Sequence, residues 1–509
     1  MRTMRTWWLG LWLAGSTGQL LAQSVAEVPY ELTRIDAGDS WVSSYWGYNA
    51  PKLVYDGEAY YTVALWGTEQ ATSSGAVYEY REGRWSRGYS WTGLNYQPGL
   101  LLLDSQQRLV LIYPRMNERP VVLRARAKGD CRQFDSVPVP ASLGKAGYLG
   151  AGIHGDRVVL GYIGDPETYS FNIAVLDLQT QQWTGPYTLA RAQRRQEPYT
   201  TWLYPIILPD ETGFHLAVSN NADLSSYYDR ILYAWVPYAP TAPVLTEEVA
   251  RVTPWTASLA FAEAMWRGPD GSVYITGQYQ PAGAANQLCV YRRDPQSGQW
   301  HSQAVDGAGV GAVFQGTADA DPLWLVNTYG NQLHLHRSAD QGGRWDAVNV
   351  PAFTPYDLVS PFFLHGIHPG SGSVMPEGPA AVFSAGSHPH YQLWFVRFQT
   401  QPTASAVLDT EVPPRRPQAV TLYPNWPNPF NAATMIGFSL PGPATVQLTI
   451  HTLGGQEVAR LFDGRQPAGT QARRWDGRDA AGHELASGVY LCRLSAGEAV
   501  LTRKLLLLR

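Results

Sequence analysis

The sequence predicts an all-β protein: a multi-bladed β-propeller, with seven blades as the expected number, followed by a small C-terminal β-sandwich. Three observations lead to this fold class. Gly, Pro and Trp account for 49, 37 and 19 of the 509 residues, while only 16% of residues are charged, a balance typical of strands joined by tight turns. A unit of about fifty residues recurs along most of the chain. The same region shows no sustained helical periodicity.

The N-terminus has the layout of a secretory signal peptide. Arg2 and Arg5 precede an apolar run from Trp7 to Ala14, and cleavage after Ala22 would make residues 1–22 the leader. The alternative is a membrane anchor, but a run of this length covers only about 12 Å of a bilayer core that is roughly 30 Å thick. We therefore expect an exported protein whose mature chain has no transmembrane segment.

Charge and cysteine content exclude other classes. The net charge of −4 comes without any basic block, so binding to nucleic acid by phosphate neutralisation is not expected. Cys131, Cys289 and Cys492 lie far apart and lack the spacing of a zinc site or a disulfide framework. Each lies in or beside an apolar segment and is expected to be a small buried residue.

Each repeat unit reads as four short strands joined by polar or Asp-Gly turns. In the first unit, an apolar strand leads to the turn at Asp56-Gly57, then to the strand from Tyr60 to Trp66. Such units cannot bury both faces alone, and stacked radially over residues 25–400 they make a propeller. Six or eight blades stay open, because Val25 to Ser44 could complete the last unit as a closing strand. A pair of β-sandwiches is the alternative fold.

The sixth unit carries the spacing Ser-x-Asp-x-Gly-x-x-Trp at Ser338, Asp340, Gly342 and Trp345. The motif resembles the Asp box of the sialidase-like, or BNR-repeat, propellers, and Asp177 to Trp183 and Asp294 to Trp300 resemble degenerate copies. The carboxylate would accept backbone hydrogens across a turn, while the Trp would pack between sheets. In such propellers this turn lies away from the ligand-binding mouth, so we expect a structural role.

Residues 401–418 read as a proline-rich linker and residues 419–509 as a compact strand-rich module. Alternation from Thr445 to Ile450 predicts an antiparallel sandwich of about seven strands. The segments from Tyr423 to Asn431 and from Trp475 to Gly482 resemble the type A C-terminal sorting domain of the type IX secretion system and its relative, the FlgD-like immunoglobulin-type domain. Trp426 departs from the family, whose motif runs directly from Pro-Asn to Pro-Phe.

The resemblance implies recognition by the outer-membrane machinery of type IX secretion. The module would then be removed or attached to surface lipopolysaccharide, and the protein would reach the cell surface or the medium. The alternative is a terminal Ig-like domain with a purely structural role.

Propeller ligands bind at the central mouth, beside the entry to each innermost strand. The repeat register gives units one to four a tyrosine just before the first strand of each. The candidate residues are Tyr48, Asn49, Asn95, Tyr96, Gln97, Tyr148, Tyr204, Glu263 and His388, with His365 and His368 expected nearby. Aromatic faces stack on sugar rings, and hydroxyl, amide and carboxylate groups bond sugar hydroxyls, which favours a glycan ligand. The alternative is that the tyrosines only pack between blades.

The sequence leaves open whether the protein is an enzyme. It lacks the Phe/Tyr-Arg-Ile-Pro motif of sialidases. Asn95-Tyr96-Gln97-Pro98 resembles the BNR-4 branch, which includes polysaccharide lyases of the ulvan lyase type and implies His, Tyr and Arg acting on a uronate. Asn95 stands where that branch usually has a His and cannot act as a base, so a lyase would need another base, such as His154 or His388.

Three functions remain as hypotheses: a glycan-binding propeller, a polysaccharide-degrading enzyme (a lyase before a glycoside hydrolase), and a protein-interaction scaffold. We expect no cofactor and no metal, because His388-Pro389-His390 has no third ligand in register and Asp319 and Asp321 read as exposed turn acids. Arg115 and Arg119 follow a strand of the second unit, where they could meet an acidic sugar or stay solvated.

Overall fold

The computed structural model describes residues 28–40, 50–66, 74–92, 99–115, 118–164, 169–223, 228–254, 258–268, 270–305, 313–315, 323–329, 332–340, 343–350, 361–376, 378–387, 390–400, 420–422, 425, 434–466, 469–497 and 499–507. The expected leader and linker therefore lie outside the described residues. Within these ranges the regular secondary structure is almost entirely β-strand, with short 3-10 helices η2 (Ala141–Leu143) and η3 (Pro369–Ser371). No described helix is long and apolar enough to cross a membrane.

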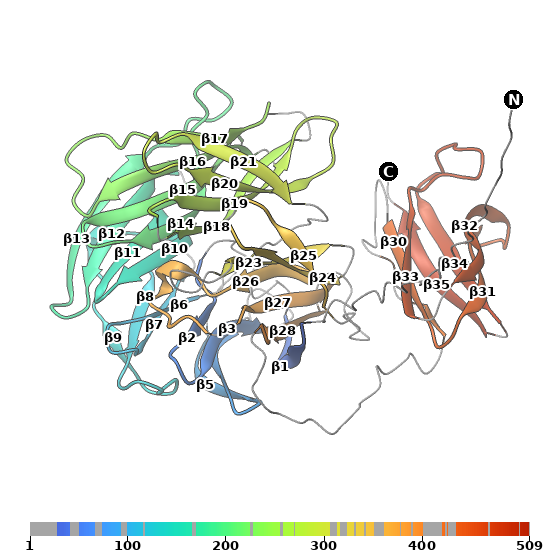
Figure 1. The fold of residues 1–509 in the computed structure, drawn as a ribbon, viewed down its shortest axis with the longest axis horizontal. Helices are drawn as coiled ribbons and strands as arrows, with labels where there is room; N and C mark the ends of the chain where they lie inside the picture. The colour runs from blue at the N-terminus through green and yellow to red at the C-terminus, as the bar shows by residue number, and fades with distance from the viewer. Residues whose placement is uncertain are drawn as a thin grey trace, which may run out of the picture.

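The described residues up to position 400 form seven four-stranded antiparallel sheets, the blades in Figure 1. Blade 1 contains β2 (Leu53–Tyr55), β3 (Tyr60–Trp66), β4 (Ser74–Arg81) and β5 (Arg84–Thr92); blade 2 contains β6 (Leu100–Leu103), β7 (Leu109–Tyr113), β8 (Val121–Ala125) and β9 (Phe134–Val137). Blade 3 contains β10 (Gly147–His154), β11 (Arg157–Ile163), β12 (Phe171–Asp177) and β13 (Gln182–Ala190); blade 4 contains β14 (Trp202–Pro209), β15 (Gly213–Asn221), β16 (Tyr228–Pro237) and β17 (Glu247–Arg251).

Blade 5 contains β18 (Leu259–Arg267), β19 (Val273–Gln280), β20 (Gln287–Arg293) and β21 (Trp300–Val305); blade 6 contains β22 (Val313–Gln315), β23 (Leu323–Tyr329), β24 (Gln332–Ser338) and β25 (Asp346–Val348). Blade 7 contains β26 (Pro361–Gly366), β27 (Ala380–Ser387), β28 (His390–Phe398) and, from the N-terminus, β1 (Tyr30–Ser40). In each blade the innermost strand is the one that follows directly after the preceding blade in the chain; in blade 7 this is β26. We call the end where innermost strands begin the entry end, and the opposite end the far end.

The blades close into a ring. Innermost strands contact each other in succession, β2 with β6, β6 with β10, and so on to β22 with β26. Leu53 of β2 then bridges to Ile367, directly after β26. β1 is the outermost strand of blade 7 and pairs with β28, from Tyr30 opposite Phe398 onward. The closing strand expected between Val25 and Ser44 is therefore confirmed, and the number of blades is seven.

The core is divided among the blade interfaces. In the described residues, one cluster of buried apolar side chains lies at each of the seven interfaces. Innermost strands such as β6 and β14 are buried along their whole length, whereas outer strands such as β13 are mostly exposed. This burial explains why the inner strands read as continuous apolar runs and the outer ones do not.

An aspartate organises the turn before the outermost strand in several blades. The Asp340 carboxylate accepts the Ser338 hydroxyl and a backbone N–H four residues ahead, each at 2.8 Å. Asp177 and Asp294 accept backbone N–H groups two and three residues ahead in the equivalent turns of blades 3 and 5. These contacts satisfy the backbone within the turn, as a structural role requires. Gly342 lies outside the described residues.

A tryptophan after this turn joins its blade to the preceding one. Trp85, Trp183 and Trp300 donate their indole N–H groups to the outermost strand of the preceding blade, or to the residue after it, at 3.0, 2.8 and 2.9 Å. Trp345 packs against the apolar cluster between blades 5 and 6. The repeated Trp is therefore a contact between blades.

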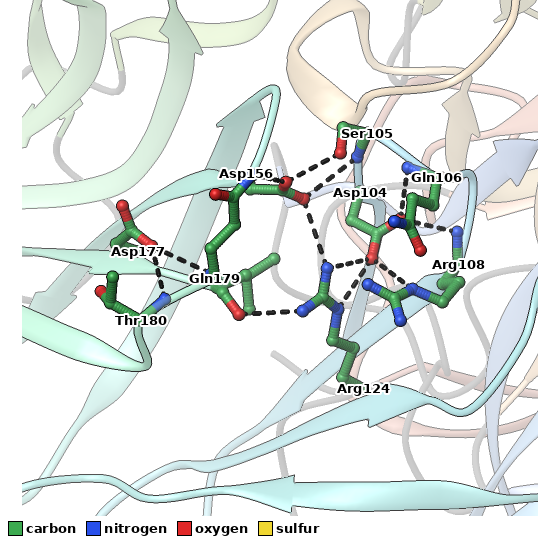
Figure 2. Close-up of polar contacts among 10 residues, drawn as sticks. Asp104, Ser105, Gln106, Arg108, Arg124, Asp156, Asp177, Gln179 and Thr180 are labelled. Atoms are coloured by element: carbon green, nitrogen blue, oxygen red, sulfur yellow. Dashed lines mark hydrogen bonds and ion pairs between the residues drawn. The ribbon is translucent and has the colours of Figure 1, made fainter.

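An ionic clamp joins blades 2 and 3 at the far end (Figure 2). Arg124 of β8 contacts the buried Asp104 carboxylate at 2.6 Å, reaches Asp156 of blade 3 at 3.3 Å, and donates to the Leu178 carbonyl at 2.8 Å. Burial opposes ionisation of Asp156, but side-chain hydrogen bonds and the Arg124 charge outweigh it and hold the Asp156 pKa below its ordinary value. One guanidinium thus serves two first turns of neighbouring blades.

Residues 367–376 cross the far end of the central channel. This connection follows β26, and its helix η3 contacts the innermost strands β6, β10, β14 and β18. Gly372 has a φ of 77°, and a Cβ there would lie 2.0 Å from the Leu103 carbonyl oxygen, so only glycine fits. Val374 then donates to the Tyr55 carbonyl of blade 1 at 2.9 Å. The connection therefore lies across the far ends of the innermost strands of blades 2 to 5.

The C-terminal module has seven described strands in two sheets, as expected for a sandwich. One sheet contains β29 (Thr421–Leu422), β30 (Thr434–Leu440) and β33 (Gly469–Trp475); the other contains β32 (Glu457–Gln466), β31 (Ala444–Thr452), β34 (Gly488–Ala496) and β35 (Ala499–Leu507). Phe438 and Trp475 of the first sheet and Leu448 of the second share one buried cluster.

The three cysteines are free and buried, as expected from their apolar surroundings. Burial raises the pKa of Cys131 to about 11 and of Cys492 to about 12, and it also raises the pKa of Cys289. Thiols with such pKa values are almost fully protonated at neutral pH, which makes them poor nucleophiles.

Replacing the clamp arginine should destabilise the propeller. In Arg124→Met the Asp104 carboxylate stays buried with fewer partners, so the free energy of unfolding should fall by about 3 kcal/mol in urea titrations of the full chain. Arg126→Met is the matched control, because Arg126 forms an exposed pair with Asp135 and its loss should cost less than about 1 kcal/mol. Equal effects of the two substitutions would contradict the clamp.

Candidate functional site

The innermost strands β10, β14 and β18 contain irregular backbone. The register with the neighbouring strand shifts near the first residues of β10 and β14 and in the middle of β18, and Tyr148, Tyr204 and Glu263 lie inside these shifts. Tyr148 and Tyr204 have φ values of 50° and 53°, a region that bulky L-residues rarely adopt. The two tyrosines therefore hold equivalent positions, within their strands rather than just before them. Strain of this kind is often stored at ligand sites.

Tyr148 and Tyr204 belong to an aromatic cluster on blades 3 to 5. The ring centroid of Tyr204 lies 5.3 Å from that of Tyr148, 5.4 Å from Phe261 and 6.1 Å from Tyr228. Tyr204 is only 6% exposed, whereas Tyr148 keeps part of its surface exposed. Burial raises the pKa of Tyr228 to about 12, against hydrogen bonds from Tyr204 and Asn221 that lower it. Tyr204 thus supports the cluster, and Tyr148 remains accessible.

Glu263 begins a chain of polar side chains on blade 5. The residue is 9% exposed, and its carboxylate accepts a hydrogen bond from Gln278 Nε2 at 2.6 Å. The Gln278 oxygen in turn accepts from Asn286 Nδ2 at 2.7 Å. The carboxylate is therefore held in place beside the aromatic cluster.

An arginine-rich loop, residues 191–201, lies between blades 3 and 4 at the entry end. Arg191, Arg194 and Arg195 in this loop are exposed. The Arg194 guanidinium lies 4.7 Å from the ring centroid of Tyr169, a cation–π contact, and the Arg195 N–H donates to the Ala222 carbonyl at 3.2 Å. The loop therefore places one guanidinium, that of Arg194, beside an aromatic ring at the entry end.

A buried polar network fixes this loop to blade 4. Arg230 pairs with Asp229 at 3.0 Å and donates to the Tyr199 carbonyl at 2.6 Å. Asn220 donates to Asp229 at 2.7 Å and accepts the Thr201 N–H at 3.1 Å. Burial raises the pKa of Asp229, against hydrogen bonds from Asn220 and the Arg230 charge. The network bonds to the loop backbone at two points, the Tyr199 carbonyl and the Thr201 N–H, and therefore holds the loop in position.

Lys52 is a buried amine at the entry end of blades 1 and 2. It is 2% exposed, its Nζ donates to the Gly99 carbonyl at 2.9 Å, and burial lowers its pKa to about 7. A lysine of this pKa is partly neutral at physiological pH. Its burial keeps a polymeric substrate from its nitrogen, so it is a structural group in this conformation.

The structure places the predicted site residues as follows. Tyr148 and Tyr204 are close to the entry ends of β10 and β14, and Glu263 is in the middle of β18, the innermost strand of the next blade. The remaining candidates, Tyr48, Asn49, Asn95, Tyr96, Gln97 and His388, lie outside the described residues. Within the described residues, no cluster of three His, Cys, Asp or Glu side chains could hold a metal ion.

Three histidines lie away from the mouth. The sequence had placed His365 and His368 near it and had offered His154 as a catalytic base. His368 belongs to the far-end connection, accepts the Gly370 N–H at 3.0 Å, and has its pKa lowered to about 4 by burial. His365 is next to last in β26. His154 ends β10, six residues from Tyr148, which is about 20 Å along a strand. The repeat register did not reveal the long far-end connection, which explains the misplacement.

Sequence reasoning missed the loop arginines, Tyr169 and Tyr228. The signal for the arginines was present, because three arginines occur within five residues shortly before the innermost strand of blade 4. Tyr169 and Tyr228 lie next to the turns between second and third strands, which also face the entry end. The sequence analysis considered only the residues before the first strand of each unit, so it did not include these turns.

Comparison with known proteins identifies the C-terminal module. Residues 427–499 match the family model of the FlgD Ig-like domain. The C-terminal module is a FlgD Ig-like domain. Among curated proteins, no sequence matches the chain.

Solved structures resemble the remainder of the chain. Two structures of an ulvan lyase from polysaccharide lyase family 25, one bound to -[GlcA(1-4)Rha3S]-, match with TM-scores of 0.50 and 0.51 at 10% identity, covering 71% of this chain and 95% of theirs. PorZ of Porphyromonas gingivalis, a bacterial surface component of the type IX secretion system, matches at a TM-score of 0.41 and 15% identity, covering 91% of this chain and 60% of its own. The lyase likeness shows the propeller fold alone.

The two bulge tyrosines should respond differently to truncation. Tyr204→Ala removes a buried ring from the aromatic cluster and should lower the free energy of unfolding by about 3 kcal/mol. Tyr148→Ala should cost less than about 1.5 kcal/mol, because its ring is partly exposed. Urea unfolding of both full-length variants measures the difference. A larger loss for Tyr148→Ala would show that its ring, too, is chiefly a packing element.

Proposed function

We propose that this protein is exported and that its propeller binds a glycan at the entry end. The observation that carries the proposal is the strained Tyr148 beside the aromatic cluster and the anchored arginine loop. Aromatic faces contact the C–H faces of sugar rings, while Tyr, Asn and Arg donate to oxygen. The connection of residues 367–376 lies across the opposite end of the innermost strands.

The arginine loop favours an acidic glycan. Arg191, Arg194 and Arg195 are exposed at the entry end, and guanidinium groups form strong bidentate bonds with carboxylates and sulfates. The fold neighbour bound to -[GlcA(1-4)Rha3S]- supports the same ligand class, because that saccharide carries a uronate and a sulfate.

Binding is preferred to cleavage. A lyase needs a base of near-neutral pKa within reach of the substrate. Among the described residues, His154 and His368 lie at the far end and Lys52 is buried from solvent. A protein-interaction scaffold is the second alternative and is separated by the experiment below.

We propose that the C-terminal domain directs the protein through type IX secretion. The FlgD Ig-like match covers residues 427–499, and the sequence motifs from Tyr423 to Gly482 resemble the type A sorting domain related to it. The leader-like residues 1–22 are consistent with the required first crossing of the inner membrane. The expected destination is the cell surface or the medium.

Glycan binding is tested with the full mature chain on uronate, sulfated and neutral polysaccharides, by affinity electrophoresis and by absorbance near 235 nm for unsaturated products. We expect retardation on acidic polymers without absorbance. Tyr148→Ala should weaken retention about tenfold, since stacking of one ring contributes about 1–1.5 kcal/mol. Arg126→Gln is the control, because Arg126 is exposed at the far end of blade 2, and it should leave retention unchanged. Rising absorbance would establish a lyase, and no retention of any polymer would favour a scaffold.

The export route is tested by removing residues 419–509 in the native host. The truncated protein should keep a folded propeller, because the sandwich has its own apolar core, and it should accumulate in the periplasm. Fractionation with antibodies against the propeller measures its location. Normal arrival of the truncated protein outside the cell would refute a sorting role.

A further inference from the structure

A hollow of about 580 Å³ opens on blade 2, apart from the aromatic cluster. One wall comes from the turn after β7 with Arg115, Glu118 and Arg119, and the other from β9 and the connection that follows it, ending at Lys145. Its volume falls in the range of about 300–1,000 Å³ typical of ligand pockets. It therefore has room for a saccharide unit.

The polar lining of this hollow is mostly cationic. Three cations, Arg115, Arg119 and Lys145, face one carboxylate, Glu118. Arg115 pairs with Glu118 at 3.3 Å, but the side chains are 48% and 61% exposed. An exposed pair of this kind is weak and exchanges readily with a competing anion. Within the described residues, no acidic side chain forms an ion pair with Arg119 or Lys145.

Arg119 is held in position by backbone. Its Nη1 donates to the Val139 carbonyl on the opposite wall at 2.6 Å. A guanidinium has five N–H donors, so this bond fixes its orientation and leaves others for a ligand. The cation therefore bridges the two walls of the hollow, which gives the site a preformed donor.

The remaining lining is apolar and small. Pro120, Pro138, Val121 and Val139 line the hollow, with the Ser136 hydroxyl nearby. Such a surface contacts the C–H face of a pyranose ring, while a small hydrated ion gains little from it. The combination favours an organic ligand that carries a negative charge.

We propose that this hollow is a second binding site, for a sugar unit that bears a carboxylate or a sulfate in an acidic polysaccharide. The site does not depend on binding at the aromatic cluster. Lys145 precedes Tyr148 by three residues, at most about 10 Å along an extended chain, so one polymer can contact both places.

The test uses the full chain with polygalacturonate, dextran sulfate and neutral dextran, by calorimetry at low and high salt. Arg119→Gln and Lys145→Gln should each weaken binding of an acidic polymer about fivefold at low salt, and the effect should shrink at high salt. Glu118→Gln should tighten binding about twofold, because it removes the competing carboxylate. Arg126→Gln is the matched control on the same blade and should change nothing.

The two acidic polymers distinguish the charged group: binding of polygalacturonate assigns a carboxylate, and binding of dextran sulfate alone assigns a sulfate. Unchanged binding in both pocket variants overturns the proposal, and so does an equal loss in Arg126→Gln or equal affinity for neutral dextran. If Arg119→Gln lowers thermal stability, the proposal is judged on the binding of Lys145→Gln and Glu118→Gln, which change exposed side chains. Loss of binding in Tyr148→Ala alone would support the site at the aromatic cluster and refute the site in the hollow.

Discussion

Closure of the ring by the N-terminal strand is the constraint on which the other features depend. β1 brings residues from the start of the chain into blade 7, where Glu31 pairs with Arg397 at 2.8 Å. Glu31 also accepts the Tyr80 hydroxyl of blade 1, and Trp85 of blade 1 donates to Thr33 at 3.0 Å. One strand therefore fastens the last blade to the first. Since every interface has its own apolar cluster, an open ring would expose the clusters on either side of the gap.

The ring also explains the difference between the two ends of the propeller. Several far-end turns satisfy their own backbone through aspartates such as Asp210, which accepts two N–H groups at 2.8 Å each. The connection of residues 367–376 then lies across this end, in contact with the innermost strands of blades 2 to 5. At the entry end, register shifts in β10 and β14 place the bulky Tyr148 and Tyr204 at positive φ, a feature that costs stability and persists where the surroundings hold it. The packing of the aromatic cluster around Tyr204 is what holds this backbone.

The sequence predicted the features that recur, and missed those that occur once. Repeated apolar runs and Asp turns were enough for the four-stranded blades, the closing strand and the seven strands of the sandwich. The far-end connection could not be foreseen, because Gly370 and Gly372 owe their identity to carbonyls of Ile207 and Leu103, distant in sequence. The bulge at Tyr148 and Tyr204 is likewise a consequence of pairing with the next strand. Repeat register located these tyrosines along the chain without showing their backbone conformation or their mutual contact.

The distribution of charge gives the propeller a direction. The chain as a whole is slightly acidic, at −4, yet exposed arginines lie at the entry end on the loop with Arg194 and around the hollow with Arg119. The far-end loop after β8 also carries exposed cations, but Arg126 and Lys128 there are paired with Asp135 and Glu58. Many acids of the far end are neutralised in place, as Asp104 is by Arg124, or bound to backbone N–H groups, as Asp294 is. A field of this form repels polyanions weakly at long range and attracts them locally to one end. On the proposed function, an acidic polymer meets the propeller at the end where the aromatic cluster and these arginines lie.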